Sequence, residues 1–283
     1  MKGDILARIR SQYNTFTKAE KKVADFILAD PRRMLYLSIT DLADACGVGD
    51  TSVFRFCRDL LLKGYQEFKM AVAQCMAADD EAPPPVDPDA DNDSLLNIVH
   101  RMLGTNVAAL KETAGFIQEP QVGQAVDWML AASRIYFFGV GASMITALSG
   151  CNRFMRITPK VSITIDAHLQ AMAATLMEPQ DLAVVISYSG STRDSVELAR
   201  IAAGRGARVI CITRFIKSPL TGHAHLTLLC GANEGPYQGG SLSAMLAQMF
   251  LLDVLYMAYY RRTRDLSKAN RALTTDSISS KLY

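Results

Sequence analysis

The sequence predicts two different folds in one chain: an all-helical domain over residues 1–77 and a doubly wound, five-stranded parallel α/β domain over residues 94–283. Three observations predict this. Residues 1–77 follow a helical pattern, and residues 78–93 are rich in proline and acidic side chains. From Ile135 onward, apolar runs of strand length alternate with helical patterns, which is typical of a parallel sheet covered by helices.

Composition limits the classes of function. The 283 residues carry a net charge of only +2, so a surface that binds a polyanion has to be local. The six cysteines form no C-x-x-C pair, and we expect buried thiols in a reducing cytoplasm rather than disulfides or a metal site. From the residues at the N-terminus we expect no signal peptide, and we expect the apolar stretch Ala244–Tyr260 to be too short and too interrupted to span a bilayer. We expect a cytoplasmic protein without a membrane partner.

Residues 38–61 match the pattern of a helix-turn-helix. Ser38 and Asp41 resemble a capping box, so the first helix is expected over Ile39–Ala45, with a break at Gly47. The second helix is expected to start near Asp50 and to bury an apolar face. Small and apolar residues stand at the offsets that hold the two helices at an angle, namely Ala43, Gly47, Val48, Val53 and Phe56.

The exposed face of the second helix is the predicted DNA-reading surface, because recognition-helix side chains reach base edges there. The candidate DNA-binding residues are Asp50, Thr51, Ser52, Arg55, Arg58 and Lys63. Lys18, Lys21, Lys22, Lys63 and Lys69 are candidate phosphate contacts. The competing interpretation is that these basic residues form a solvated helix face.

Residues 78–93 carry seven acidic and no basic side chains and are expected to form an extended linker. Ser94 is expected to cap a long helix ending near Ile117, followed by a helix over 122–132. The expected strands are 135–138, 161–165, 182–186, 209–212 and 226–230, with helices between them and a last amphipathic helix over Leu242–Tyr260. The arginines at 261, 262 and 264 fit a basic helix end.

Two loops follow strands of the predicted sheet and open helices. They are FGVGAS at 138–143 and ISYSGST at 186–192. Clustered hydroxyl groups beside a helix N-terminus favour an anion, and the carboxyl edge of a parallel sheet is where α/β folds bind ligands. A plain N-cap and turn is the alternative for SYSGST. Dinucleotide binding, with Asp166 on the ribose, is disfavoured because Met144 replaces the third glycine of that fingerprint.

The segment VADFILADPRRMLYLSITDLADACGVGDTSVFRFCRDLLLKGYQEFK resembles the N-terminal domain of RpiR-type transcriptional regulators, and the two loops resemble those of the sugar isomerase (SIS) domain. The likeness covers Met1–Ala77 and roughly Gln121–Asp265. It implies a DNA-binding regulator, a repressor more often than an activator, whose SIS domain binds a phosphosugar. The ligand-binding residues that it implies are Gly141, Ala142, Ser143, Ser187, Ser189, Gly190, Ser191 and Thr192.

The chain departs from the family pattern at two places. Gly49 stands where the family usually has Ser, which weakens the N-cap of the recognition helix. LLLKG at Leu60–Gly64 places Leu61 where a glycine usually ends that helix, so we expect the helix to run longer here.

A sugar-phosphate isomerase with an accessory helical domain is the competing function, because SIS domains also serve enzymes. His168, Glu178, His223 and Glu234 are candidate general bases, but no spacing pairs them, so we assign no catalytic residue. No cofactor or metal is expected. The expected partners are a double-stranded DNA operator and a second copy of the chain, in a homodimer or homotetramer. The helix Leu242–Tyr260 is either a dimer surface or buried in its own domain.

Overall fold

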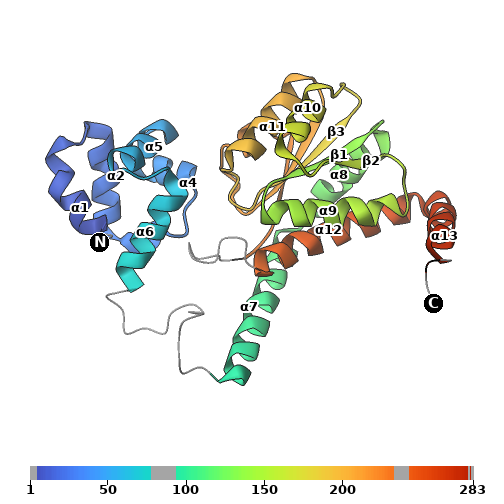
Figure 1. Cartoon of the computed structure of the whole chain (residues 1–283), viewed down its shortest axis with the longest axis horizontal. Coiled ribbons are helices and arrows are strands. Elements are labelled where there is room, and N and C mark those ends of the chain that lie inside the picture. Colours follow the sequence, from blue (N-terminus) through green and yellow to red (C-terminus); the bar gives the residue numbers. More distant parts are fainter. Residues whose placement is uncertain (1–4, 78–93, 233–241, 280, 282–283) are drawn as a thin grey trace. The chain divides into compact units, whose positions relative to one another are not determined.

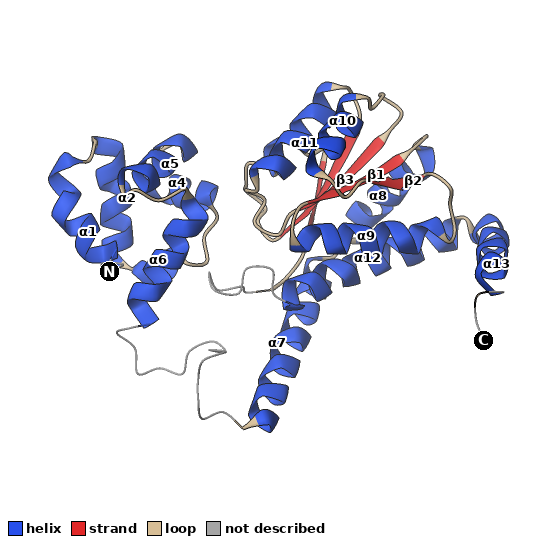
Figure 2. Cartoon of the chain, in the orientation of Figure 1, coloured by secondary structure: helices blue, strands red, loops and turns tan. Residues whose placement is uncertain are grey.

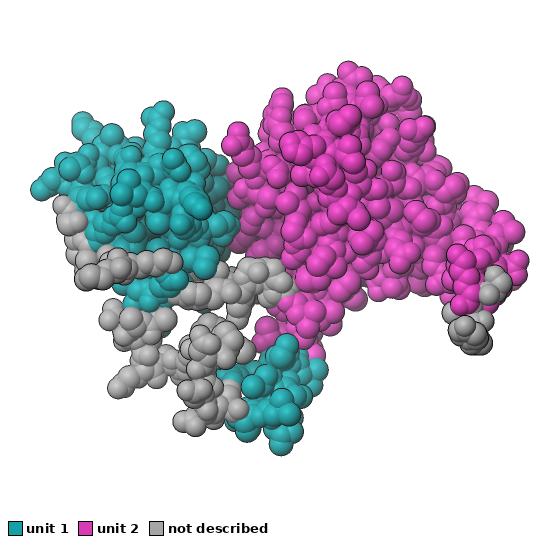
Figure 3. All heavy atoms as spheres, viewed as in Figure 1, with its two compact units in different colours: residues 1–104, 233–241 teal, residues 105–232, 242–283 magenta. Residues whose placement is uncertain are grey.

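The computed structural model describes residues 5–77, 94–232, 242–279 and 281 (Figures 1 and 2). These residues fall into two compact units, one holding 5–77 with 94–104 and the other holding 105–232 with 242–279 and 281 (Figure 3). The predicted linker 78–93 and the candidate Glu234 lie outside the described residues. We describe each unit by itself.

The N-terminal residues form helices packed around aromatic side chains. The elements are α1 (Ile5–Gln12), the 3-10 turn η1 (Tyr13–Thr15), α2 (Lys18–Ala29), α3 (Pro31–Met34), α4 (Ile39–Cys46), α5 (Asp50–Asp59) and α6 (Tyr65–Ala77). Phe56 is fully buried at the centre, with its ring centroid 5.0 Å from that of Phe16 and 5.6 Å from that of Phe68. Burial of these rings supplies much of the stability of so small a helical core.

The second unit is a parallel sheet with helices on both faces. After α7 (Leu95–Phe116) and α8 (Glu119–Ala131), the chain forms β1 (Ile135–Gly139), α9 (Ala142–Met155), β2 (Val161–Ile163), α10 (Ala167–Thr175), β3 (Leu182–Ile186), α11 (Arg193–Gly204), β4 (Arg208–Thr213), the 3-10 turn η2 (Thr221–His223), β5 (Leu226–Leu229), α12 (Leu242–Arg262) and α13 (Arg264–Ser279). The five strands are all parallel, in the order β2-β1-β3-β4-β5.

Side chains that alternate along the strands enter two separate cores. Phe137, Val184 and Ile210 belong to the cluster that also contains residues of α8, α9 and α12. Phe138, Val185 and Cys211 belong to the cluster that contains residues of α10 and α11. Every residue of β3 is buried, as expected for a central strand covered on both faces. The predicted doubly wound five-stranded fold is confirmed.

Several predicted boundaries shift, and one helix was missed. The Ser94 cap is confirmed, since its hydroxyl accepts a hydrogen bond from the Asn97 amide. The helix predicted at 122–132 begins earlier, at Glu119, and the edge strand β2 ends at Ile163 rather than at residue 165. Arg261 and Arg262 lie in the last turn of α12, as predicted, whereas Arg264 begins α13, the helix that was missed. Among its residues only Ser267 is buried, so α13 lacks the apolar pattern that predicts a helix.

Helix α12 is longer than the sequence analysis predicted. Its 21 residues are long and apolar enough, by length and composition alone, to cross a membrane, which corrects the expectation that this stretch is too short. Nine of those residues are buried, and α12 packs against α8 and α9. Gln248 accepts a hydrogen bond from Thr146, and Asp253 pairs with Arg153, so the polar residues of α12 are used inside its own unit. Packing inside the α/β unit therefore explains the buried face of α12, which is the second of the two predicted roles; the first, a dimer surface, stays a prediction.

Candidate functional site

The helix-turn-helix forms as predicted. Ser38 and Asp41 make the capping box, with the Ser38 hydroxyl accepting from the Asp41 amide at 3.0 Å. Helix α4 ends at Gly47, whose φ of +61° lies in the left-handed region, and the Val48 amide donates to the Ala43 carbonyl at 2.9 Å. These contacts fix the turn before α5 begins at Asp50. Helix α5 buries Val53, Phe56 and Cys57 against the core, as expected.

The outer face of α5 carries the predicted DNA-reading side chains. Thr51, Arg55 and Arg58 are exposed, and Ser52 is half-buried. Asp50 is used differently: its carboxylate accepts a hydrogen bond from the Thr40 hydroxyl at 2.9 Å, which joins α5 to α4. Lys63 is exposed beyond the end of α5. The arginines thus lie on solvent with no role in the core, where base edges and phosphates could be reached.

The predicted phosphate-binding lysines divide into two groups. Lys18 and Lys22 are exposed on α2, and a Cβ built on Gly47 would lie 3.8 Å from the Lys22 ammonium, so Lys22 is beside the turn. Lys21, on the same helix, is half-buried, with its ammonium 5.5 Å from the centroid of the Tyr13 ring. Lys69 is wrong as a phosphate contact. It is 6% exposed, donates to the Leu37 carbonyl at 3.1 Å and lies over the Tyr65 ring. Burial lowers its pKa to about 8.

The expected lengthening of α5 at Leu61 is also wrong. Helix α5 ends at Asp59, and Leu61 has a φ of +57° with an exposed side chain. The Leu62 amide donates to the Cys57 carbonyl at 3.0 Å, which closes the helix as a glycine ending would. Leu61 therefore adopts the left-handed conformation that glycine favours and carries its strain. At the other end, Gly49 caps α5 without a side-chain hydrogen bond, as predicted.

The two hydroxyl loops lie at one edge of the α/β sheet. Strands β1 and β3 are neighbours, and their last residues, Gly139 and Ile186, are paired in register. The chain leaves β1 toward β2 on one side and leaves β3 toward β4 on the other, so the strand order reverses between them. Ligands in open α/β sheets bind outside the carboxyl ends of strands at such a switch point.

The first loop is shaped by glycine and held by a glutamine. Gly139 exchanges two hydrogen bonds with the buried Gln170 amide, of 3.2 and 3.1 Å. Gly141 caps α9 with a φ of +61°, and a Cβ there would meet nothing within 4 Å. Ala142 and Ser143 follow in the first turn of α9, half-buried. The backbone at Gly141 is therefore open to a ligand, and the N-terminus of α9 supplies amide donors.

The second loop gathers hydroxyl groups before α11. The buried Ser187 donates to the Thr192 hydroxyl at 3.4 Å, and the Ser191 amide donates to the Ser189 hydroxyl at 3.2 Å. Thr192 is the N-cap residue of α11, yet its side chain makes no capping hydrogen bond. The simple N-cap interpretation therefore does not explain the Thr192 hydroxyl. Ser187, Ser189, Ser191 and Thr192 together offer neutral donors and acceptors to an anion at the helix N-terminus.

Residues after β4 hold this second loop in place. The Thr213 hydroxyl donates to the Tyr188 carbonyl at 3.0 Å, and the Leu220 amide donates to the Gly190 carbonyl at 2.9 Å. Gly190 has a φ of +59°, and a Cβ on it would lie 2.2 Å from the Ser218 hydroxyl. Sequence analysis missed Gln170, Thr213 and Ser218, because each acts on a residue distant in the chain.

The other candidates from the sequence have structural surroundings of their own. Asp166 caps α10 by accepting from the Leu169 amide at 3.0 Å, which accounts for it without a ribose. His168 is exposed in the first turn of α10, and Glu178 is exposed and accepts a hydrogen bond from the Gln180 amide. His223 lies half-buried in η2. In the described parts of the chain, no group of three or more His, Cys, Asp or Glu could hold a metal ion.

Comparisons with known proteins agree with both halves. Residues 3–79 match the helix-turn-helix domain of the rpiR family, and residues 129–258 match the SIS domain. A helix-turn-helix-type transcriptional regulator of Haemophilus influenzae is 31% identical over 278 residues, covering 98% of this chain and 96% of that protein. The regulator HexR of Pseudomonas aeruginosa is 34% identical over 252 residues, covering 89% of this chain and 87% of HexR. The solved structure of Vibrio vulnificus NanR complexed with ManNAc-6P has a TM-score of 0.85 at 29% identity, covering 98% of this chain and 99% of that one.

Proposed function

The chain belongs to the RpiR family of helix-turn-helix transcriptional regulators with a C-terminal SIS domain, and we propose that a phosphosugar bound at its two hydroxyl loops controls its binding to DNA. The regulated genes are those of sugar metabolism, and repression is the proposed sense of regulation. The proposed domains are 1–77 for DNA binding, 78–93 as a linker and 94–283 for ligand binding.

Exposed arginines on a firmly packed helix support the DNA-binding assignment. Arg55 and Arg58 project from α5, while the opposite face of the same helix is fully buried. Arginine reads guanine through paired hydrogen bonds, and Thr51 and Ser52 can contact several bases. Asp50 and Lys63 flank these residues at either end of the reading face. Lys18 and Lys22 are the proposed phosphate contacts.

The open backbone and clustered hydroxyls at the switch point carry the ligand proposal. Gly141, Ala142 and Ser143 form one wall, and the loop from Ser187 to Thr192 forms the other. Neutral donors suit a phosphomonoester that must bind and leave reversibly. NanR, similar over the whole chain, was solved with ManNAc-6P, a ligand of this chemical class.

We assign the α/β unit a sensing role rather than catalysis. Aldose–ketose isomerisation needs a general base aimed at two adjacent carbons of the sugar. Of the candidates, His168 and Glu178 are exposed at the two ends of the α10 segment, and neither is held by contacts with the hydroxyl loops among the described residues. Steady product formation from a phosphosugar at enzyme-like rates would overturn this assignment.

A dimer or tetramer is the proposed assembly. Paired helix-turn-helix units read two half-sites about one helical turn, or a multiple of it, apart, which predicts a pseudo-palindromic operator. Ligand binding can alter the spacing of the units only to the extent that it favours one arrangement over the other.

Two binding assays test the proposal. Operator sites are selected from random duplex DNA, and a thermal-shift panel of phosphosugars that includes ManNAc-6P identifies the effector. The double variant Ser189→Ala/Thr192→Ala is expected to bind the selected DNA while losing the thermal shift. The matched control Ser277→Ala/Ser279→Ala removes two exposed hydroxyls from α13 and is expected to keep both. A ligand response that survives the loop variant would place the site elsewhere.

A further inference from the structure

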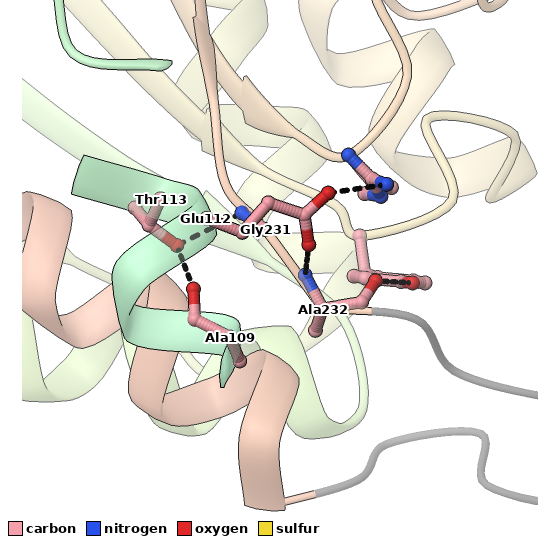
Figure 4. A network of polar contacts seen from close by, with 7 residues as sticks. Ala109, Glu112, Thr113, Gly231 and Ala232 are labelled. Atoms are coloured by element: carbon pink, nitrogen blue, oxygen red, sulfur yellow. Dashed lines mark hydrogen bonds and ion pairs between the residues drawn. The ribbon is translucent and has the colours of Figure 1, made fainter. Parts of the chain in front are cut away.

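The C-terminal half of α7 is docked tightly on the exit of β5 (Figure 4). Thr113 is fully buried; its hydroxyl donates to the Ala109 carbonyl at 2.7 Å and accepts from the Gly231 amide at 2.9 Å. A Cβ on Gly231 would lie 2.6 Å from the Cβ of Glu112 and 2.9 Å from the Ala109 carbonyl oxygen. The two backbones are therefore as close as glycine allows.

Glu112 lies in a closed ring of four polar contacts. The Tyr188 hydroxyl donates to the Ala232 carbonyl at 2.6 Å, and the Ala232 amide donates to the Glu112 carboxylate at 3.2 Å. The other carboxylate oxygen of Glu112 pairs with the Arg214 guanidinium at 2.7 Å. The ring closes where the Arg214 amide donates to the Tyr188 carbonyl at 3.0 Å. Tyr188 belongs to the hydroxyl loop, so the ring joins that loop to α7.

The ring is partly shielded from water. The side chains of Glu112 and Arg214 are 32% and 20% exposed, and Arg214 lies over the Phe116 ring of α7, 5.4 Å from its centroid. On the other side, the Tyr188 ring meets the Phe215 ring edge-on at 6.2 Å. Ion pairs in such surroundings interact more strongly than pairs on an open surface.

Ala232 is the strained member of the ring. Its φ of +144° is one that residues with a side chain rarely adopt. Both of its backbone polar groups are used in the ring, the carbonyl by Tyr188 and the amide by Glu112. Such strain persists only where neighbouring contacts hold it, and strained residues cluster at ligand sites and switch regions.

We propose that Glu112 is a positioning residue that couples the hydroxyl loop to α7, so that an anion bound at the loop changes how firmly α7 is held. This inference rests on the proposed function. A ligand on Ser187, Ser189 and Thr192 constrains Tyr188, which lies between them in the chain. Tyr188 is hydrogen-bonded to Ala232 and Arg214, and both of these contact the Glu112 carboxylate. Helix α7 is the first helix after residues 78–93, so a change in its docking reaches the chain that leads to the DNA-binding half.

The coupling is reciprocal, as any linkage between two sites must be. The docked arrangement of α7 changes the affinity of the loop for its ligand by the same factor by which the bound ligand changes the docking equilibrium of α7. Glu112→Gln removes the charge that attracts Arg214 while leaving an amide oxygen that can accept from Ala232. This substitution therefore tests the ring without leaving a cavity where the Glu112 side chain lies.

A double-mutant cycle in the full chain tests the ring without any ligand. Unfolding of the α/β unit is followed by fluorescence of Trp128, the only tryptophan in the sequence, which lies on α8. Each variant raises the unfolding constant by some factor relative to wild type. We expect the product of the factors for Tyr188→Phe and Glu112→Gln to exceed the factor for the double variant about fivefold or more. The control cycle pairs Tyr188→Phe with Thr146→Val, which breaks the buried Thr146–Gln248 bond elsewhere in the unit. Multiplicative behaviour in both cycles would overturn the proposal.

Hydrogen exchange of the full chain then tests transmission, with ManNAc-6P, glucose 6-phosphate and inorganic phosphate as probes. In the wild type, a probe that slows exchange at 186–192 is expected to change exchange at 107–116 as well. In Glu112→Gln the loop protection is expected to remain and the α7 response to vanish. An α7 response of equal size in the variant would overturn the coupling. If no probe slows hydrogen exchange at 186–192 in the wild type, the proposed ligand site is wrong. The double-mutant cycle still tests whether Tyr188 and Glu112 are coupled through the ring.

Discussion

The predicted DNA-reading face of α5 and the hydroxyl loops proposed to bind a ligand differ in whether the same residues serve both binding and stability. Arg55 and Arg58 project into solvent, while separate residues of α5 fill the core. In the loops, Ser187 and Gly190 are themselves buried and are braced by Thr213 and Ser218. This difference predicts that substitutions on the α5 face can alter DNA binding without loss of fold. Substitutions in the hydroxyl loops are expected to require matching changes in the residues that support them.

The two surfaces also differ in charge. The α5 face carries permanent positive charges, which suit a polyanion. The loops carry hydroxyl groups and helix N-termini, which suit a small anion that exchanges with solvent. The predictions below test this contrast, from the largest expected effect to the smallest.

Gly190→Ala is expected to destabilise the α/β unit by about 3 kcal/mol, because it adds both backbone strain and overpacking. The Cβ would lie 2.2 Å from the Ser218 hydroxyl. Gly206→Ala is the matched control in the same unit, because Gly206 follows the end of α11 with a φ of +82° and the added Cβ would make only an ordinary contact, 3.4 Å from Pro179. Its cost is expected to be only about 1–2 kcal/mol. Urea unfolding followed by Trp128 fluorescence measures both, and equal costs would contradict the bracing described for the second loop.

Arg55→Ala is expected to weaken binding to the selected operator by about 1–3 kcal/mol, or roughly 5- to 150-fold. Its exposed position predicts an unchanged unfolding midpoint and an unchanged phosphosugar thermal shift. Fluorescence anisotropy with labelled duplex gives the affinity. Arg200→Ala removes the same charge from an exposed, Glu197-paired arginine of α11 and serves as the control. Equal losses of operator affinity in the two variants would mean that Arg55 contributes only through the net charge of the protein.

Lys69→Met is expected to change how the stability of the helical unit depends on pH. Burial lowers the folded-state pKa of Lys69 to about 8 from 10.5, so the unfolded chain binds more protons between these values. Stability from this residue therefore rises with pH through that window, by roughly 3 kcal/mol. Far-UV circular dichroism in urea measures it, while Trp128 reports the other unit.

Comparing the pH dependence of stability in Lys69→Met and in wild type separates the effect of Lys69 from that of groups with the opposite pH dependence. Burial raises the pKa of Cys57 to about 12 and also raises that of Tyr65, and both lower the stability as pH rises. These terms are shared by wild type and variant. Lys63→Met removes the same charge from an exposed side chain and controls for the change in net charge. A wild-type curve that tracks Lys69→Met from pH 8 to 10.5 would show that Lys69 does not titrate in this window.

The strands and the two loops could be predicted because their signals are local. A strand such as β3 is buried on both faces, so it appears as an unbroken apolar run, and a hydroxyl cluster between a strand and a helix is visible in the letters alone. The helix-turn-helix was predictable for the same reason, since its cap, turn and apolar positions all fall within 24 residues, Ser38–Leu61.

What could not be predicted depends on contacts between distant residues. Gln170 clamps Gly139 from 31 positions away, and Glu112 meets Ala232 across 120. Lys69 carries a side chain that is exposed in most proteins, so its burial against Tyr65 has no local signal. Helix α13 was missed because it offers no apolar face to a core.

Leu61→Gly is expected to give the smallest effect and the one opposite in sign: a stabilisation of the helical unit by up to about 1 kcal/mol. The φ of +57° costs a leucine about 1–2 kcal/mol, and glycine avoids that cost while losing roughly 0.5–1 kcal/mol through its greater freedom when unfolded. Little burial is lost, because Leu61 is 81% exposed. Leu61→Asn, which tolerates this conformation, is expected to lie between the two. Urea unfolding by circular dichroism measures all three. A destabilised glycine variant would mean that contacts of the Leu61 side chain outweigh the backbone strain at the end of α5. In that case this end of the predicted DNA-reading helix would contribute to the stability of the helical unit, unlike its exposed arginines.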